Sequence, residues 1–144
     1  MYEEVKEEIK LCEGYVNKIY KCSEGFDTIF YGHKITPDDE YEHGIEYTKQ
    51  EGELVFERDF QRTLEAAERL IGDRSINNTA KEVIINMVYQ IGEGGVSKFK
   101  NMWKALDTEN YGEASFQMLD SLWAKQTPAR AGKLAGKMRA AKEA

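Results

Sequence analysis

The hydrophobic pattern of this chain changes character at about residue 48. Upstream, residues 15–31 carry aromatic and branched side chains on both sides of a Ser23-Glu24-Gly25 turn, a pattern typical of a β-hairpin. Downstream, apolar residues recur at helical spacing as far as the carboxyl end. Because strands and helices occupy separate stretches, the sequence predicts an α+β fold with a small antiparallel sheet, a long connecting helix and an all-helical region.

The helices on either side of this change have recognisable sequence boundaries. Apolar residues spaced by three and four predict a first amphipathic helix over residues 2–12, ended by Gly14. Thr48-Lys49-Gln50-Glu51 is a capping box, so we expect a long helix from there to about Gly72. The expected organisation is one domain, residues 1–144, comprising a sheet-bearing part (1–47), a connecting helix (48–72) and a helical part (73–144).

The helical part contains one segment that should be buried. Residues 79–91 are apolar on nearly all sides, which is typical of a helix in the middle of a bundle, and Gly92-Glu93-Gly94-Gly95 should stop it. Two further helices are expected over residues 96–106 and 111–123. A last helix should begin at Thr127-Pro128, since threonine at a cap followed by proline is a specific start signal.

Charge and composition exclude several classes of function. The 144 residues carry a net charge of −6, which disfavours nucleic acid as a partner. Acidic and basic residues number 18 and 9 over residues 1–70, but 8 and 11 over residues 71–144. The longest charge-free stretch, Val83–Gly92, is far shorter than the roughly 20 residues of a membrane-crossing helix. The amino terminus lacks the basic and then apolar pattern of a secretory signal, so we expect no signal peptide and no membrane span.

Three chemically reactive side chains fall at the ends of different elements in the first part of the chain. Glu13 closes the first helix, Cys22 follows the first hairpin strand, and Thr28 lies on the second strand. A hairpin folded back on the helix end can bring all three together. Taken singly, each residue type has an ordinary structural role: a solvated acid, a small buried thiol and a strand former.

The spacing of these three residues resembles the active-site signature of a known family. Eight residues separate Glu13 from Cys22 and five separate Cys22 from Thr28, with Gly32-His33 following. This pattern is similar to that of the phage-type muramidases, the T-even phage lysozyme-like endolysin family. Residues 85–93 and 123–131 also resemble the helical lobe of that family, so the resemblance covers nearly the whole chain and implies a lysozyme-like α+β fold.

The resemblance implies a bacteriolytic glycosidase that hydrolyses the β-1,4 bond between N-acetylmuramic acid and N-acetylglucosamine in peptidoglycan. The cleft would lie between the sheet-bearing and helical parts. Glu13 corresponds to the general acid, and Cys22 to the residue across the sugar, where Thr28 helps to hold the attacking water. We expect inversion, which requires room for that water between the acid and the base.

Other matched positions are implied to support the reaction. Arg130 corresponds to an arginine that pairs with the catalytic acid, and His33 to a structural histidine that pairs with an aspartate, here Asp59. The side chains expected to contact substrate are Tyr89, Gln90, Met102, Gln117 and Lys34, with a core position for Tyr89 equally open.

Two residues depart from the usual family pattern. The middle position holds Cys22, whose thiol, with an ordinary pKa of about 8.5, is only a few per cent ionised at pH 7, so activity should favour alkaline pH and be sensitive to alkylation. Phe30 stands where the family usually has glycine, and its ring could narrow the cleft floor. Two unlinked thiols are expected rather than a disulfide between Cys12 and Cys22, because the chain should be made in a reducing compartment.

The implied biology is lysis of a bacterial host by a phage. We expect peptidoglycan as the partner, no metal or cofactor, a monomer, and synthesis in the host cytoplasm followed by release through a holin-type pore to the cell wall. Two alternatives remain open at this stage. One is a catalytically weakened lysozyme-fold protein that binds the wall or serves in assembly; the other is a lytic transglycosylase, which needs no water-holding pair.

Overall fold

The computed structural model describes residues 2–141, and the chain divides into two compact units between Arg62 and Thr63. Helix α2 (Lys49–Ile71) contributes to both units, so the boundary falls within a helix. The two units are described separately below. The expected division into residues 1–47, 48–72 and 73–144 stays a prediction.

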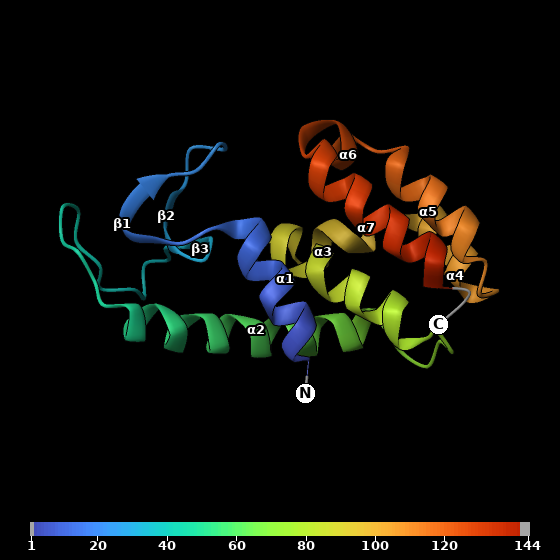
Figure 1. Cartoon of the computed structure of the whole chain (residues 1–144), viewed down its shortest axis with the longest axis horizontal. Coiled ribbons are helices and arrows are strands. Elements are labelled where there is room, and N and C mark those ends of the chain that lie inside the picture. Colours follow the sequence, from blue (N-terminus) through green and yellow to red (C-terminus); the bar gives the residue numbers. More distant parts are fainter. Residues whose placement is uncertain (1, 142–144) are drawn as a thin grey trace. The chain divides into compact units, whose positions relative to one another are not determined.

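The N-terminal unit combines helix α1 (Glu3–Glu13) with a small antiparallel sheet (Figure 1). The strands are β1 (Val16–Lys21), β2 (Asp27–Phe30) and β3 (His33–Lys34), hydrogen-bonded in the order β1-β2-β3. Gly14 ends α1 as expected, at a φ of +73°. The hairpin is confirmed, whereas β3 was not predicted because two residues are too short to carry a strand pattern.

An aromatic core holds this sheet to the beginning of α2. Ile29, Phe30 and Val55 are buried at its centre. Partly buried side chains surround them, namely Tyr15, Ile19, Ile35, Tyr41 and Tyr47. The second strand does not alternate between buried and exposed residues, because its last three residues are all buried. Gly52 lets α2 lie close to the rings of Tyr15 and Phe30, since a Cβ at this position would collide with both.

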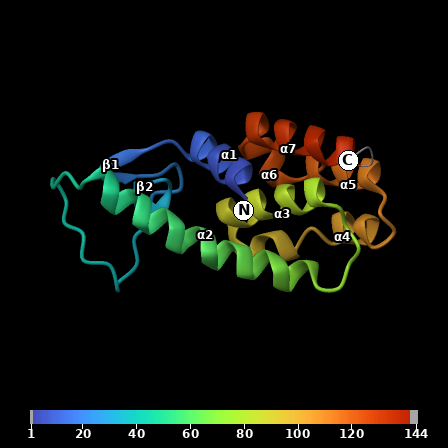
Figure 2. The ribbon, with the colours of Figure 1, turned by 60° about the horizontal axis from the view of Figure 1, so that its bottom comes forward.

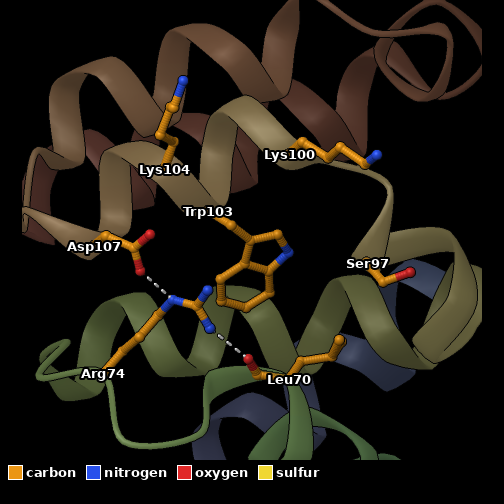
Figure 3. A pocket seen from close by; sticks show the side chains of 7 residues that line it. All are labelled: Leu70, Arg74, Ser97, Lys100, Trp103, Lys104 and Asp107. Carbon is orange, nitrogen blue, oxygen red and sulfur yellow. Dashed lines mark hydrogen bonds and ion pairs between the residues drawn. The ribbon is translucent and has the colours of Figure 1, made fainter.

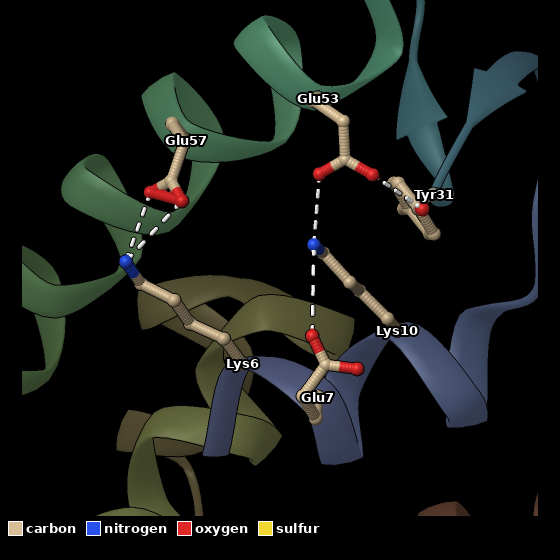
Figure 4. A network of polar contacts seen from close by, with 6 residues as sticks. All are labelled: Lys6, Glu7, Lys10, Tyr31, Glu53 and Glu57. Atoms are coloured by element: carbon tan, nitrogen blue, oxygen red, sulfur yellow. Dashed lines mark hydrogen bonds and ion pairs between the residues drawn. The ribbon is translucent and has the colours of Figure 1, made fainter. Parts of the chain in front are cut away.

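Ion pairs join α1 to the first half of α2 (Figure 4). Lys6 Nζ lies 3.0 Å from Glu57 Oε2, and Lys10 Nζ lies 2.8 Å from Glu53 Oε2. Glu53 also accepts a hydrogen bond of 2.8 Å from the hydroxyl of Tyr31, which follows β2. One carboxylate therefore connects α1, α2 and the sheet, and it fixes the end of α1 relative to the strands.

The start of α2 confirms the predicted capping box. The backbone N–H of Glu51 donates to the Thr48 hydroxyl at 3.1 Å, and the Glu51 carboxylate accepts from the Thr48 N–H at 3.2 Å. These two bonds satisfy amides that a helix start leaves without partners.

The C-terminal unit is built from helices around α3 (Figures 1 and 2). Helix α7 (Pro128–Ala140) packs against α3 (Asn78–Ser97), α5 (Tyr111–Leu119) and α6 (Leu122–Gln126), and α4 (Lys100–Asp107) packs against α5. Residues 83–88 of α3 are all buried, which confirms the expectation of a central buried helix. Among the helices that the structure describes, none combines the length and the apolar character needed to cross a membrane.

Several helix boundaries differ from those expected. Gly92 interrupts α3 at a φ of +79°, but helix resumes after it and continues to Ser97, so the next helix begins only at Lys100. The helix expected over 111–123 is two helices, because the Ser121 hydroxyl caps a new start by accepting from the Ala124 N–H at 3.1 Å. Pro128 opens α7 as predicted, whereas the Thr127 hydroxyl donates back to Trp123 O at 3.0 Å and does not cap α7.

Candidate active site

Glu13 is held where α1 ends and packs against a glycine. Its side chain is half-buried, and its carboxylate lies so close to the Gly32 Cα that a Cβ at that position would collide with Oε1. Gly32 also has a φ of +67°, which L-residues with a side chain rarely adopt. Gly32 therefore has two roles: it allows the turn after β2, and it leaves space for the Glu13 carboxylate.

A tight turn after β1 sets the position of Cys22. Its N–H donates to Phe26 O at 2.9 Å and its carbonyl accepts from the Gly25 N–H at 2.9 Å. Gly25, at a φ of +85°, supplies the conformation that such a turn requires. The turn brings Cys22 within hydrogen-bonding reach of Thr28 on the neighbouring strand.

Thr28 is a buried polar residue in the middle of the sheet, with only 2% of its surface exposed. Its hydroxyl donates to Phe26 O at 2.8 Å, so its single proton has a partner. If that proton instead turns toward Cys22, it stabilises the thiolate. The pair can therefore reorganise its hydrogen bonds as Cys22 gains or loses its proton.

The surroundings of Cys22 favour its ionised form. Partial burial alone would raise the pKa of the thiol, but hydrogen bonds from the backbone of Phe26 and Glu24 and from the Thr28 side chain, together with the charge of Lys34, lower it. Lys34 pairs directly with Thr28 in the β2–β3 register, and its Nζ lies 3.6 Å from Glu24 Oε1. Lys34, which is expected to contact substrate, thus also acts electrostatically on Cys22.

Tyr20 lies within electrostatic reach of both Glu13 and Cys22, and it was missed in the sequence. Burial raises the pKa of Tyr20, and the nearby charges of Glu13 and Cys22 raise it further. Tyr20 pairs with Thr28 across the β1–β2 ladder, so the two side chains share one face of the sheet. Its position near the end of β1, two residues before Cys22, was the available signal, since residues two apart along an extended chain face the same way.

His33 makes the expected contact with Asp59 and a second one besides. Its Nδ1 lies 2.7 Å from Asp59 Oδ2, and its Nε2 lies 2.9 Å from Asp39 Oδ2. Burial would lower the pKa of His33, but the hydrogen bonds and charges of Asp59 and Asp39 outweigh it and raise the pKa. Asp39 was missed, although the turn-forming sequence at Thr36-Pro37 placed it nearby; it accepts from the Thr36 N–H at 2.9 Å.

The expectation that the Phe30 ring narrows a cleft floor is wrong, because the ring lies in the core of the N-terminal unit. Only 1% of Phe30 is exposed, and its ring packs edge-on against Tyr41 at a centroid distance of 5.5 Å and stacks on Tyr15 at 6.1 Å. Its backbone, however, has a φ of +59°, in the region that favours glycine. The aromatic core holds a phenylalanine in the backbone conformation that glycine adopts more easily.

In the C-terminal unit, Gln90 and Arg130 are fixed by neighbouring helices. The Gln90 side-chain oxygen accepts from Trp123 Nε1 at 2.8 Å, beside a half-buried Tyr89. Arg130 Nε and Nη2 donate to Asn86 Oδ1 at 3.0 and 2.7 Å. The buried Asn86 thus orients the guanidinium of Arg130, while the pairing of Arg130 with Glu13 stays a prediction.

Two of the residues expected to contact substrate line one hollow in this unit. Met102 and Gln117 border a hollow of about 280 Å³, together with Phe99, Asn101 and Trp123. Met102 has no exposed surface, so it supports the wall of the hollow from beneath. Gln117 is partly exposed, and its Nε2 donates to Glu113 at 2.6 Å.

The arrangement of the potential metal ligands and of the two cysteines can be stated for the described residues. Over residues 2–141, no group of three or more histidine, cysteine, aspartate or glutamate side chains is arranged to hold a metal ion. Cys12 and Cys22 are both free thiols, as expected.

Comparison with known proteins identifies the family. The phage lysozyme family model matches residues 10–143. Probable T4-type lysozyme 1 of Dictyostelium discoideum is 29% identical over 157 residues, which span 93% of this chain and 92% of that protein.

Two phage proteins are similar over most of this chain and a smaller share of their own length. Pre-baseplate central spike protein Gp5 of Enterobacteria phage T4 is 30% identical over 144 residues, 85% of this chain and 25% of that protein. Peptidoglycan hydrolase gp36 of Pseudomonas phage phiKMV is 27% identical over 127 residues, 88% of this chain and 14% of that protein. With its sheet-bearing and helical units and a family match over nearly its whole length, the chain belongs to the phage lysozyme family.

Proposed function

We propose that this lysozyme-type hydrolase cleaves the β-1,4 bond between N-acetylmuramic acid and N-acetylglucosamine in peptidoglycan, with inversion. The observation that carries the proposal is the grouping of Glu13, Cys22 and Thr28 around Tyr20, at the end of α1 and one edge of the hairpin. A carboxylic acid on one side of a sugar and a base with a positioned water on the other are what glycoside hydrolysis by inversion requires.

In the proposed reaction Glu13 donates its proton to the glycosidic oxygen as the bond to the anomeric carbon breaks. Positive charge then develops on the sugar ring, and water attacks the anomeric carbon from the opposite face. The Cys22 thiolate accepts a proton from that water, and the Thr28 hydroxyl orients the water. The acid ends deprotonated and the thiol protonated, so exchange with solvent restores both groups.

The lowered pKa of Cys22 supports its place in this scheme. A free thiol is mostly protonated at neutral pH and is then a poor base, but a lowered pKa increases the thiolate fraction. Lys34 contributes a positive charge near Cys22 that favours the thiolate. This effect partly compensates for the absence of a carboxylate at position 22. Gly32 supports the acid by leaving space for the Glu13 carboxylate.

Substrate binding is proposed for the exposed Lys34 and for the partly exposed side chains Tyr89, Gln90 and Gln117. Arg130 is proposed to pair with Glu13 and position it. We further propose that the protein is a monomer that lyses a phage host. It would be made in the host cytoplasm and released to the wall through a holin-type pore. The support for this proposal is the family and the phage origin of two of the relatives above.

The Glu13→Gln variant tests the proposal. Turbidity of a purified peptidoglycan suspension should fall with the wild-type protein, while Glu13→Gln should be slower by about 10²- to 10⁴-fold, the usual worth of a general acid. Glu4→Gln, the same change at an exposed position of α1, is the matched control and should keep full activity. Equal rates for Glu13→Gln and the wild type would contradict the role of Glu13.

Analysis of the products separates the remaining alternatives. Hydrolysis by inversion releases reducing ends with the α configuration, observable by NMR immediately after cleavage. Anhydromuramic ends would instead identify a lytic transglycosylase. A wild-type protein that binds peptidoglycan without cleaving it would favour the wall-binding alternative.

A further inference from the structure

A second hollow lies within the C-terminal unit (Figure 3) and contains none of the side chains proposed for catalysis or substrate binding, although Lys100 also lines the hollow that Met102 and Gln117 border. It has a volume of about 330 Å³ and is formed where the end of α2 approaches α4. The side chains that line it include Leu70, Arg74, Lys100, Trp103, Lys104 and Asp107.

Trp103 and Arg74, which line the hollow, are both held by contacts within this unit. Only 7% of Trp103 is exposed, and its Nε1 donates to Val96 O at 3.0 Å. The guanidinium carbon of Arg74 lies 4.7 Å from the centre of the indole ring, a cation–π arrangement. Arg74 Nε contacts Asp107 Oδ1 at 2.6 Å, and Nη1 donates to the Leu70 carbonyl at 2.7 Å (Figure 3). Arg74 is therefore fixed in orientation before any ligand arrives.

Positive charge exceeds negative charge at this hollow. Arg74 Nη2 makes no hydrogen bond to any residue of the described chain, and neither Lys100 nor Lys104 has an ion-pair partner within residues 2–141. The hollow is thus lined by three cations and one carboxylate, that of Asp107. In Figure 3 the two lysines extend from the rim, and their flexible stems allow the ammonium groups to turn toward a ligand.

We propose that this hollow binds a phosphate monoester. Such a group carries a charge of about −1.5 to −2 at pH 7, which matches the two excess positive charges, whereas a carboxylate carries only one negative charge. The fixed guanidinium supplies a planar N–H donor suited to a phosphate oxygen, and the lysines supply mobile charges. The indole and the Leu70 side chain cover the organic part of the ester, for which the volume leaves room. This binding does not depend on the proposed hydrolysis.

NMR of the indole N–H groups tests the proposal directly. Titration with glycerol 3-phosphate at constant ionic strength should shift the Trp103 signal saturably, with a dissociation constant below about 10 mM. The Trp123 indole, which is hydrogen-bonded to Gln90, is the internal control and should stay in place. The phosphodiester of two glycerols, with one charge, should bind several-fold more weakly. An unmoved Trp103 signal, or equal binding of the diester, would overturn the proposal.

A pair of double variants separates the hollow from general surface charge. Lys100→Gln with Lys104→Gln should weaken binding at least about tenfold, since two charge-assisted contacts are lost. Lys125→Gln with Lys133→Gln removes the same charge from exposed positions that do not line the hollow, and should change binding less than about twofold. All four lysines are exposed, so both variants should fold. Equal weakening in the two variants would contradict a specific site.

Discussion

Replacing Phe30 with alanine and with glycine separates the packing of its ring from the conformation of its backbone. The ring is buried and contacts Tyr15, Tyr41 and Tyr47, while the backbone φ is +59°. At ordinary strand positions alanine is more stable than glycine. At Phe30 the left-handed backbone should reverse that order.

The magnitudes follow from these two features. Loss of the buried ring should cost about 3–5 kcal/mol in either variant. Alanine keeps the left-handed conformation, which costs about 1–2 kcal/mol for a residue with a side chain. Glycine avoids that cost but loses about 0.4–1 kcal/mol because its unfolded chain is more flexible. Phe30→Gly should therefore be more stable than Phe30→Ala by about 1 kcal/mol.

Urea unfolding followed by far-ultraviolet circular dichroism measures this difference. Ile29→Ala and Ile29→Gly form the control pair, because Ile29 is fully buried on the same strand and has no positive φ. There alanine should be more stable than glycine by about 0.5–1 kcal/mol. If glycine were the less stable residue at position 30 as well, by a similar amount, the argument from the backbone conformation would be refuted.

Three further predictions concern the site. Gly32→Ala should displace the Glu13 carboxylate and lower kcat by about 10²-fold while the protein stays folded, and an unchanged kcat would show that the contact is not needed. In a Cys12→Ser background, alkylation of Cys22 with iodoacetamide should abolish hydrolysis, and an undiminished rate would remove Cys22 from the mechanism. The pKa of His33 is raised above 6.5, so its ion pairs stabilise the fold fully below pH 6.5 and are lost as pH rises through the folded pKa. The stability difference between wild type and His33→Gln, measured by urea unfolding, should accordingly be larger at pH 5.5 than at pH 9, and a constant difference would contradict this linkage.

Local sequence signals predicted the elements well where one physical effect dominates. The Thr48–Glu51 capping box and the Gly14 stop both depend on hydrogen bonds within a few residues, and both are present. The split between α5 and α6 was missed because Ser121 caps a helix inside an otherwise continuous apolar pattern. Periodicity alone does not register such a cap.

The site was predictable as a set of residues but less so as an arrangement. The spacing of Glu13, Cys22 and Thr28 pointed to the correct hairpin, in which the turn after β1 brings Cys22 within hydrogen-bonding reach of Thr28. The direction in which the Phe30 ring points depended on an aromatic core assembled from distant segments, including Tyr41 and Tyr47. That information does not reside in the local pattern around position 30.

The pH dependence of hydrolysis by the wild type and by Cys22→Asp tests the proposed mechanism most directly. If the Cys22 thiolate accepts the proton from water, the wild-type rate should rise with pH along a limb below the ordinary thiol pKa of about 8.5, because the surroundings of Cys22 lower its pKa. Cys22→Asp should remain active and should move this limb down by at least about two pH units, since an aspartate ordinarily ionises near pH 3.9. Superimposable profiles for the two proteins would contradict the assignment of Cys22 as the base.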